Sequence, residues 1–175
     1  EIVTGDWSSD VCSSDLILVV DIIFAGILCC IAMDLWQRLL FVMYKIPPTN
    51  WAPTGRWLLM LINKGIIFNI NLENEKPIKY ELPIGWIFHY IVGIGYGFAY
   101  WICLTFFDFF NTSLLSGFLF GLISVVVPWF FFLPATGKGL MGNKTPNPKL
   151  TKVLSTCSHV VVGLFLAIGF SLMEY

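Results

Sequence analysis

Polar side chains that can bind protons, ions or metals occur inside the apolar stretches of this sequence. Four of them lie in separate stretches, each long enough to cross about 30 Å of hydrocarbon: Asp34, His89, Ser124 and His159. Polar groups in such stretches usually face the interior of a helix bundle. At a rise of about 1.5 Å per residue, the carboxyl group and both imidazoles fall roughly 9 to 14 Å inside one membrane face, with the serine at comparable depth. We therefore predict an intramembrane polar layer as the candidate site.

This layer has three chemical uses that the residue types allow. A proton or ion relay fits because imidazole titrates near neutrality. Two imidazoles and a carboxylate also match an N,N,O metal site, and two imidazoles can bind a haem between helices. The relay requires the least geometry, and the sequence leaves the cofactor and the metal unknown. Pro128 lacks an N–H and is expected to kink its helix, which leaves the Ser124 carbonyl free to face a cavity.

Each residue of the layer also has a purely structural explanation. Asp34 can pair with Arg38 one turn later, and either histidine can be a neutral ring hydrogen-bonded to a neighbouring helix. No nucleophile stands beside a base, and no P-loop, catalytic triad or dinucleotide fingerprint is present in the sequence. We therefore predict no catalytic residues and favour a protein that is not an enzyme.

The elements that must position the layer are transmembrane helices. Apolar residues make up 57% of the 175 residues, charged residues only 12%, and the mean hydropathy is +0.80. These values lie far from the globular balance of about 25% charged residues, so the fold class is an all-α integral membrane bundle. A single membrane domain, residues 17–175, is expected, with four spans at about 17–43, 84–107, 112–133 and 150–173.

Residues 1–16 do not fit this description. The polar run 6–16 matches one translated frame of a common sequencing-library adapter, and it lacks the basic region of a signal peptide. We interpret residues 1–16 as an artefactual tail and expect the native protein to begin near Ile17. The four remaining cysteines lie in apolar runs and form no disulfide or metal-type spacing.

Lysine and arginine predict the orientation. None occurs between Tyr80 and Gly137, whereas the first and third connections are basic. The positive-inside rule therefore places both basic connections in the cytoplasm and both termini outside. In the first connection, Pro53–Ile62 predicts a short interfacial helix, and 68–82 suggests a small hairpin. The third connection, 134–148, is rich in Gly, Pro and Asn and predicts a shaped loop.

A second candidate site lies on this basic face. Arg56, Lys138 and Lys144 can bind an anionic lipid headgroup or a phosphate, although topology alone also explains such charges. Membrane lipid is the expected partner, and no nucleic acid is expected. Small residues recur at four-residue spacing, as at Gly93 and Gly97, and predict close helix packing. The same surfaces allow a homodimer.

A faint internal repeat relates the two halves. His89-Tyr-Ile-Val-Gly93 is matched by His159-Val-Val-Val-Gly163, and Pro53-Thr-Gly-Arg56 by Ala135-Thr-Gly-Lys138. Such a repeat fits two helical hairpins in parallel arrangement, a symmetry found in transporters.

These residues together resemble a known family. The resemblance rests on five segments in order: Ala32–Trp36, Asn50–Trp57, the His89 span, Thr145–Pro148 and the His159 span. The family is an uncharacterised bacterial four-span inner-membrane family, domain of unknown function 2938. The resemblance implies the architecture and the bacterial inner membrane, but no activity.

Two functional hypotheses follow. The polar layer binds or relays a proton, an ion or a small solute. Alternatively, the protein is a non-catalytic scaffold or accessory subunit that presents its basic cytoplasmic loops to anionic lipid or to a partner protein.

Overall fold

The computed structural model describes residues 7–173, and within them the chain is all-helical without strands. The main helices are α1 (Trp7–Tyr44), α2 (Ala52–Lys64), α3 (Glu81–Phe106), α4 (Leu114–Ser124), α5 (Leu133–Ala135) and α6 (Pro148–Leu172). A π-helix, η2 (Pro128–Phe132), joins α4 to α5, and two 3₁₀ turns are η1 (Leu72–Asn74) and η3 (Leu140–Gly142). The predicted all-α class is confirmed.

Four helical stretches are long and apolar enough to cross a membrane: Asp15–Tyr44, Glu81–Phe106, Leu114–Ala135 and Pro148–Leu172. The four predicted spans are therefore confirmed, with ends that shift by a few residues. Large apolar side chains cover their outer faces, such as Ile87 and Ile91 on α3, which are 61% and 57% exposed. Helices that are apolar on all sides are typical of membrane spans, because lipid covers the outer face. α1 begins at Trp7, so its backbone includes most of the adapter-like run; the first six residues lie outside the described residues.

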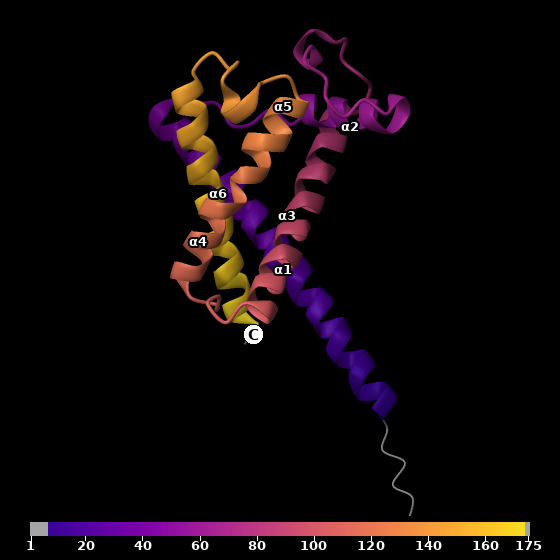
Figure 1. Cartoon of the computed structure of the whole chain (residues 1–175), viewed down its shortest axis with the longest axis vertical. Coiled ribbons are helices and arrows are strands. Elements are labelled where there is room, and N and C mark those ends of the chain that lie inside the picture. The colour runs from indigo at the N-terminus through magenta and orange to yellow at the C-terminus, as the bar shows by residue number, and fades with distance from the viewer. Residues whose placement is uncertain (1–6, 174–175) are drawn as a thin grey trace, which may run out of the picture.

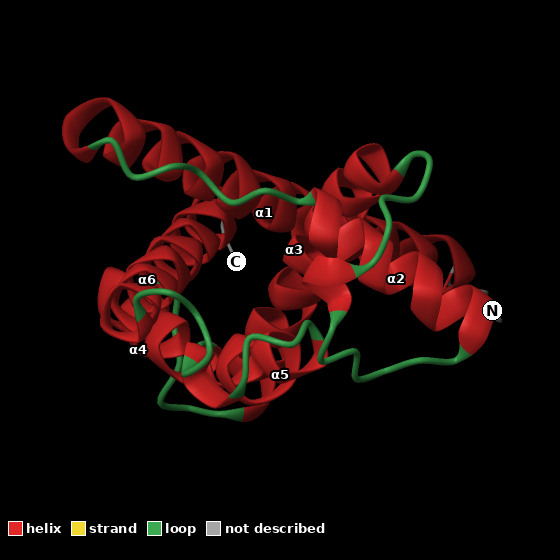
Figure 2. Cartoon of the chain, turned by 90° about the horizontal axis from the view of Figure 1, so that it is seen from above, coloured by secondary structure: helices red, strands yellow, loops and turns green. Residues whose placement is uncertain are grey.

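The spans form two hairpins that share one long seam. α1 packs against α3, and α4 packs against α6, while α1 also lies along α6 (Figure 1). Seen from above, α1, α3, α5 and α6 surround the centre of the bundle (Figure 2). The two hairpins are thus joined along α1 and α6, and α3 faces the α4–α5 span across the centre.

Small residues allow this close packing, as predicted. A Cβ at Gly93 would overlap the Cys30 sulfur and come within 2.9 Å of the Gly26 carbonyl of α1. In the second hairpin, a Cβ at Gly163 would overlap the Gly117 carbonyl of α4. In both hairpins, therefore, the glycine four residues after the histidine lets the second helix approach the first closely. A Cβ at Gly95 would have no atom within 4 Å, so this glycine is not required for packing between the helices. The homodimer through such small-residue faces stays a prediction.

α2 lies across one end of the bundle (Figure 1), and it confirms the helix predicted for Pro53–Ile62. Proline in its first turn and left-handed Gly65 at its C-cap define its ends. The third connection lies at the same end, which we call the basic end: it carries α2, residues 65–80 and residues 136–147 (Figure 1). The Asn69 N–H donates to the Ala135 carbonyl, so the two basic connections are bound to each other.

The small hairpin predicted for residues 68–82 is wrong. The Arg56 guanidinium donates hydrogen bonds to the Leu72 and Glu75 carbonyls at 3.1 and 2.7 Å. The Trp57 indole N–H donates to the Ile67 carbonyl at 2.7 Å. Backbone acceptors that a hairpin would pair with each other are therefore bound by side chains of α2. Leu72 is fully buried beneath this turn, where it packs with Trp57 and other apolar residues.

The third span is irregular where Pro128 was expected to kink it. Proline has no N–H for the bond to the carbonyl four residues earlier, and the helix there widens into the π-helix η2. The third connection is a shaped loop, as predicted, with Gly137, Gly139 and Gly142 at positive φ and one 3₁₀ turn, η3.

Candidate functional site: a cavity between the hairpins

A cavity of about 360 Å³ lies between the two hairpins, and its lining comes from all four spans and both basic connections. Its rim at the basic end is polar and includes Thr49, Asn50, Thr54, Lys138 and Thr151. Its inner wall is mainly apolar and includes Met33, Val92, Phe132, Leu154 and Val162. Small-molecule sites usually have this volume and this mixture of apolar walls with few polar groups.

His89 lines the cavity from α3 and is 6% exposed. Its ring stacks on Trp51, with 4.2 Å between centroids and 18° between planes. Its Nε2 atom lies 3.4 Å from Asp34 Oδ1, within ion-pair distance, but makes no hydrogen bond within the described residues. The Cys30 thiol donates to the His89 carbonyl at 3.7 Å, which holds this turn of α3 against α1.

The Asp34 carboxylate of α1 faces α3, where two side chains contact it. The Tyr90 hydroxyl donates to Asp34 Oδ2 at 3.2 Å, and the His89 ring approaches Oδ1. Among the residues that the structure describes, Asp34 forms no ion pair within 4 Å with Arg38, the alternative partner suggested by the sequence. Asp34 itself is outside the cavity lining, directly behind His89.

His159 lines the same cavity from α6. Its Nδ1 atom lies 2.9 Å from the Ser124 hydroxyl, and that hydroxyl also lies 2.9 Å from the Gly121 carbonyl. With the hydroxyl proton on the carbonyl, Ser124 accepts from a ring protonated at Nδ1; in the other tautomer the hydroxyl donates to Nδ1. The Tyr96 ring meets the His159 ring edge to face, with 5.4 Å between centroids.

The predicted layer therefore consists of two pairs, Asp34–His89 between α1 and α3, and Ser124–His159 between α4 and α6. Each imidazole has its own neighbour on its own hairpin, and both rings line one cavity. The Ser124 hydroxyl, rather than the carbonyl that the sequence suggested, makes the contact. Across residues 15–173, no three His, Cys, Asp or Glu side chains are grouped so that they could hold a metal ion.

The three predicted anion ligands lie in different settings. Arg56 is 8% exposed and bound twice by Glu81, at 2.8 and 3.0 Å, in addition to its two backbone carbonyls. The Glu81 carboxylate raises the pKa of the Arg56 guanidinium, so the pair stays charged. Lys138 lines the cavity rim, whereas Lys144 is exposed and outside the lining.

Sequence reasoning missed Trp51 and Tyr96 as site residues. Trp51 belongs to a connection, and its stacking on His89 depends on how that connection folds back over the bundle. Its place in the Asn50–Trp57 segment that carried the family resemblance was the available signal. Tyr96 lies seven residues after His89, two helical turns along the same face of α3, so periodicity could have identified it.

The fold and the site define a class: a multi-pass membrane protein with four transmembrane helices and a central cavity. A family model described as "Protein of unknown function (DUF2938)" matches residues 23–173, and the chain belongs to that family. The family resemblance seen in the sequence is thereby confirmed. No curated protein and no solved structure is significantly similar to the chain.

Proposed function

We propose that this membrane protein binds a small solute in the cavity between its two hairpins, where His89 and His159 contact the solute and exchange protons with it. One observation carries the proposal: imidazoles from two different hairpins, each oriented by a partner on its own hairpin, line one cavity of about 360 Å³. A protein that used these histidines only for packing would not need both of them beside an unfilled space.

The shape of the cavity supports a path from the basic end. Residues of both basic connections form its rim, so a solute enters past Asn50 and Lys138. Toward the opposite end, aromatic contacts fill the space between α3 and α4. Phe120 of α4 packs against Tyr96 and Tyr100 of α3, with ring centroids 6.4 and 5.0 Å apart. These contacts support access from the basic end alone, which we expect of a solute-binding membrane protein at one stage of its cycle.

The two pairs have different proton chemistry. Asp34 and His89 place a carboxyl group 3.4 Å from an imidazole, a pair of groups that can pass a proton to or from a solute. For His159 we expect the tautomer protonated at Nδ1, facing Ser124, so that the Nε2 lone pair accepts a proton or a hydrogen bond from the solute. We expect the solute to lie between these groups.

Thermal unfolding of the purified protein in nanodiscs tests the proposal. The panel consists of benzoate, benzamide and benzylammonium, one organic probe for each charge class, together with Zn²⁺ as a metal probe. A probe that binds the folded state at ten times its Kd contributes about 1.4 kcal/mol, which raises the unfolding temperature. We expect at least one probe to act in the wild type and to lose its effect in His89→Gln or His159→Gln.

Two α6 variants control for side effects. Ser158→Trp fills the cavity, because Ser158 lines it, whereas Val153→Trp introduces the same side chain at a residue that is 58% exposed on the outer face. The shift should vanish in the first and persist in the second. If no probe acts, or if the shift survives Ser158→Trp and both histidine variants, the cavity is not a binding site.

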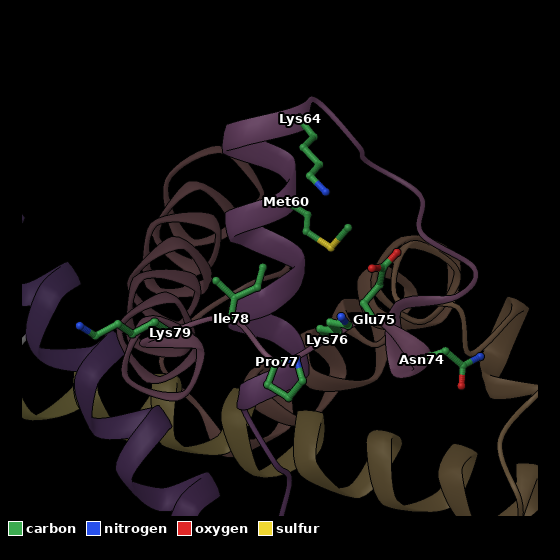
Figure 3. A pocket seen from close by; sticks show the side chains of 8 residues that line it. All are labelled: Met60, Lys64, Asn74, Glu75, Lys76, Pro77, Ile78 and Lys79. Carbon is green, nitrogen blue, oxygen red and sulfur yellow. The ribbon is translucent and has the colours of Figure 1, made fainter.

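A second candidate function is a scaffold that presents the basic end to anionic lipid. Lys64, Lys76 and Lys79 are among the residues that line a surface pocket of about 660 Å³ beside α2, where Glu75 is the one acidic lining residue (Figure 3). These lysines, exposed on the surface, replace the buried Arg56 of the original hypothesis. Replacing all three with Gln should then abolish stabilisation by phosphatidylglycerol over phosphatidylcholine in nanodiscs. Equal stabilisation of the triple variant and the wild type would contradict this function.

A further inference from the structure

We infer that the cavity accepts a small organic anion, an amphipathic carboxylate whose charged group lies at the rim and whose apolar body extends between the hairpins. This inference rests on the proposed function and names the class of solute. Its basis is the charge of the lining, the start of α2 and the gradient of polarity along the cavity.

The first observation is the charge of the lining. Lys138 is its only Lys or Arg, and the described residues that line the cavity include no Asp or Glu. No described carboxylate lies within ion-pair distance of Lys138. Asp34 contacts the lining residue His89 but is not itself in the lining, and its other carboxylate oxygen accepts from Tyr90. An ammonium group without a counter-ion at a cavity rim favours an anionic ligand.

The second observation is the start of α2. Trp51 at the N-cap supplies no side-chain acceptor to the 13-residue helix. The Ala52 N–H donates to the Asn50 side chain and the Gly55 N–H to the Trp51 carbonyl, but the Thr54 N–H has no acceptor within the described residues. Thr54 lines the cavity. The first turn of α2, with one unpaired N–H and the positive end of the helix dipole, therefore lies at the rim, where it favours negative charge.

These two features meet on the same rim and come from different connections: Thr54 from the first and Lys138 from the third. Because the Asn69 N–H binds the Ala135 carbonyl, the two connections are fixed relative to each other. A carboxylate has two oxygens, so it can accept from the Lys138 ammonium and from the α2 backbone together. A neutral amide has one acceptor oxygen and no negative charge, so it lacks the ion-pair attraction to the ammonium.

The third observation is the change of polarity with depth. Below the rim, the walls are formed mainly by apolar side chains: Met33, Phe88, Val92, Phe132, Leu133, Leu154 and Val162. Thr151 and Val162 are eleven residues apart on α6, so the cavity extends about 16 Å along the bundle. The apolar body of an amphipathic anion gains from burial there, whereas an inorganic anion would leave this surface without a partner.

Tryptophan emission tests the assignment, because Trp51 is the one tryptophan in the described lining. The protein in nanodiscs is titrated with benzoate, benzamide and benzylammonium, which share one ring and differ in charge. We expect saturable quenching by benzoate, with a Kd at least about tenfold lower than that of either analogue, the size of a charge-assisted hydrogen bond. Lys138→Gln should raise the benzoate Kd about tenfold, and Lys138→Arg should restore it.

Lys144→Gln is the matched control, since it removes a lysine of the same connection outside the lining and should leave the Kd unchanged. Equal affinity for benzamide or benzylammonium, or an unchanged Kd in Lys138→Gln, would overturn the anion assignment. Cavity-dependent binding of an analogue in place of benzoate would still leave the solute-binding proposal standing. Quenching by inorganic phosphate as tight as by benzoate would show that the apolar wall has no role, and it would overturn the amphipathic assignment.

Discussion

Arg56→Met should destabilise the protein far more than the loss of a surface cation. Arg56 and Glu81 are joined by two hydrogen bonds of 2.8 and 3.0 Å, and their side chains are only 10% and 13% exposed. The substitution leaves the Glu81 carboxylate with only the Ile78 N–H as a donor, and it removes the donor of the Leu72 and Glu75 carbonyls. Breaking a buried pair from one side costs about 3 to 5 kcal/mol, and we expect about 3 kcal/mol because the pair lies at the end of the bundle.

The assay is the free energy of unfolding from an SDS titration of helicity. Lys144→Met is the control, an exposed lysine whose loss should change stability by less than about 0.5 kcal/mol. Arg56→Met combined with Glu81→Gln should recover part of the loss, with a coupling of about 2 kcal/mol. A loss below about 1 kcal/mol in the single variant, or zero coupling, would refute the conclusion that Arg56 is structural. It would favour a headgroup-binding role instead.

Three further predictions concern packing and the site. Gly163→Ala places a methyl group against the Gly117 carbonyl and should lower the free energy of unfolding by about 2 kcal/mol. Gly95→Ala has nothing within 4 Å of the new methyl group and should be neutral or slightly stabilising. Thermal unfolding of the two variants measures this difference. Ser124→Ala removes the hydroxyl that hydrogen-bonds His159 and should weaken benzoate binding about tenfold without loss of folding, measured by the same quenching titration. Trp57→Phe loses the bond to the Ile67 carbonyl and should cost about 1 kcal/mol, seen in SDS titration.

Hydropathy and charge predicted the spans and the end that carries the basic connections, because both properties are local and accumulate over many residues. The helical rise placed Asp34, His89 and His159 at similar depth, since depth depends only on position along a helix. Rotation about each helix axis depends on packing, and the sequence could not tell whether the imidazoles met. The glycine contacts at Gly93 and Gly163 decide that rotation by bringing each second helix against the first.

The connections were the hardest part to predict. The pattern of 68–82 favoured strands, but Arg56 and Trp57 bind the backbone carbonyls from a different helix, and such long-range partners leave no local signal. For the same reason, Arg56 resembled a free anion ligand until Glu81, 25 residues away, was found against it. The cavity rim likewise combines Thr54 and Lys138 from connections more than 80 residues apart in sequence.

The central claim is that a cavity reached from the basic end lies between the hairpins, and cysteine labelling tests it most directly. Val92 lines the cavity, whereas its neighbour Ile91 is 57% exposed on the outer face of the same helix. Each is replaced by Cys in a cysteine-free background, and a membrane-impermeant methanethiosulfonate is added to one side of the membrane at a time. We predict that Val92→Cys is labelled from the side of the basic connections and Ile91→Cys from neither side. Equal labelling of the two, or labelling of Val92→Cys only from the opposite side, would contradict the account.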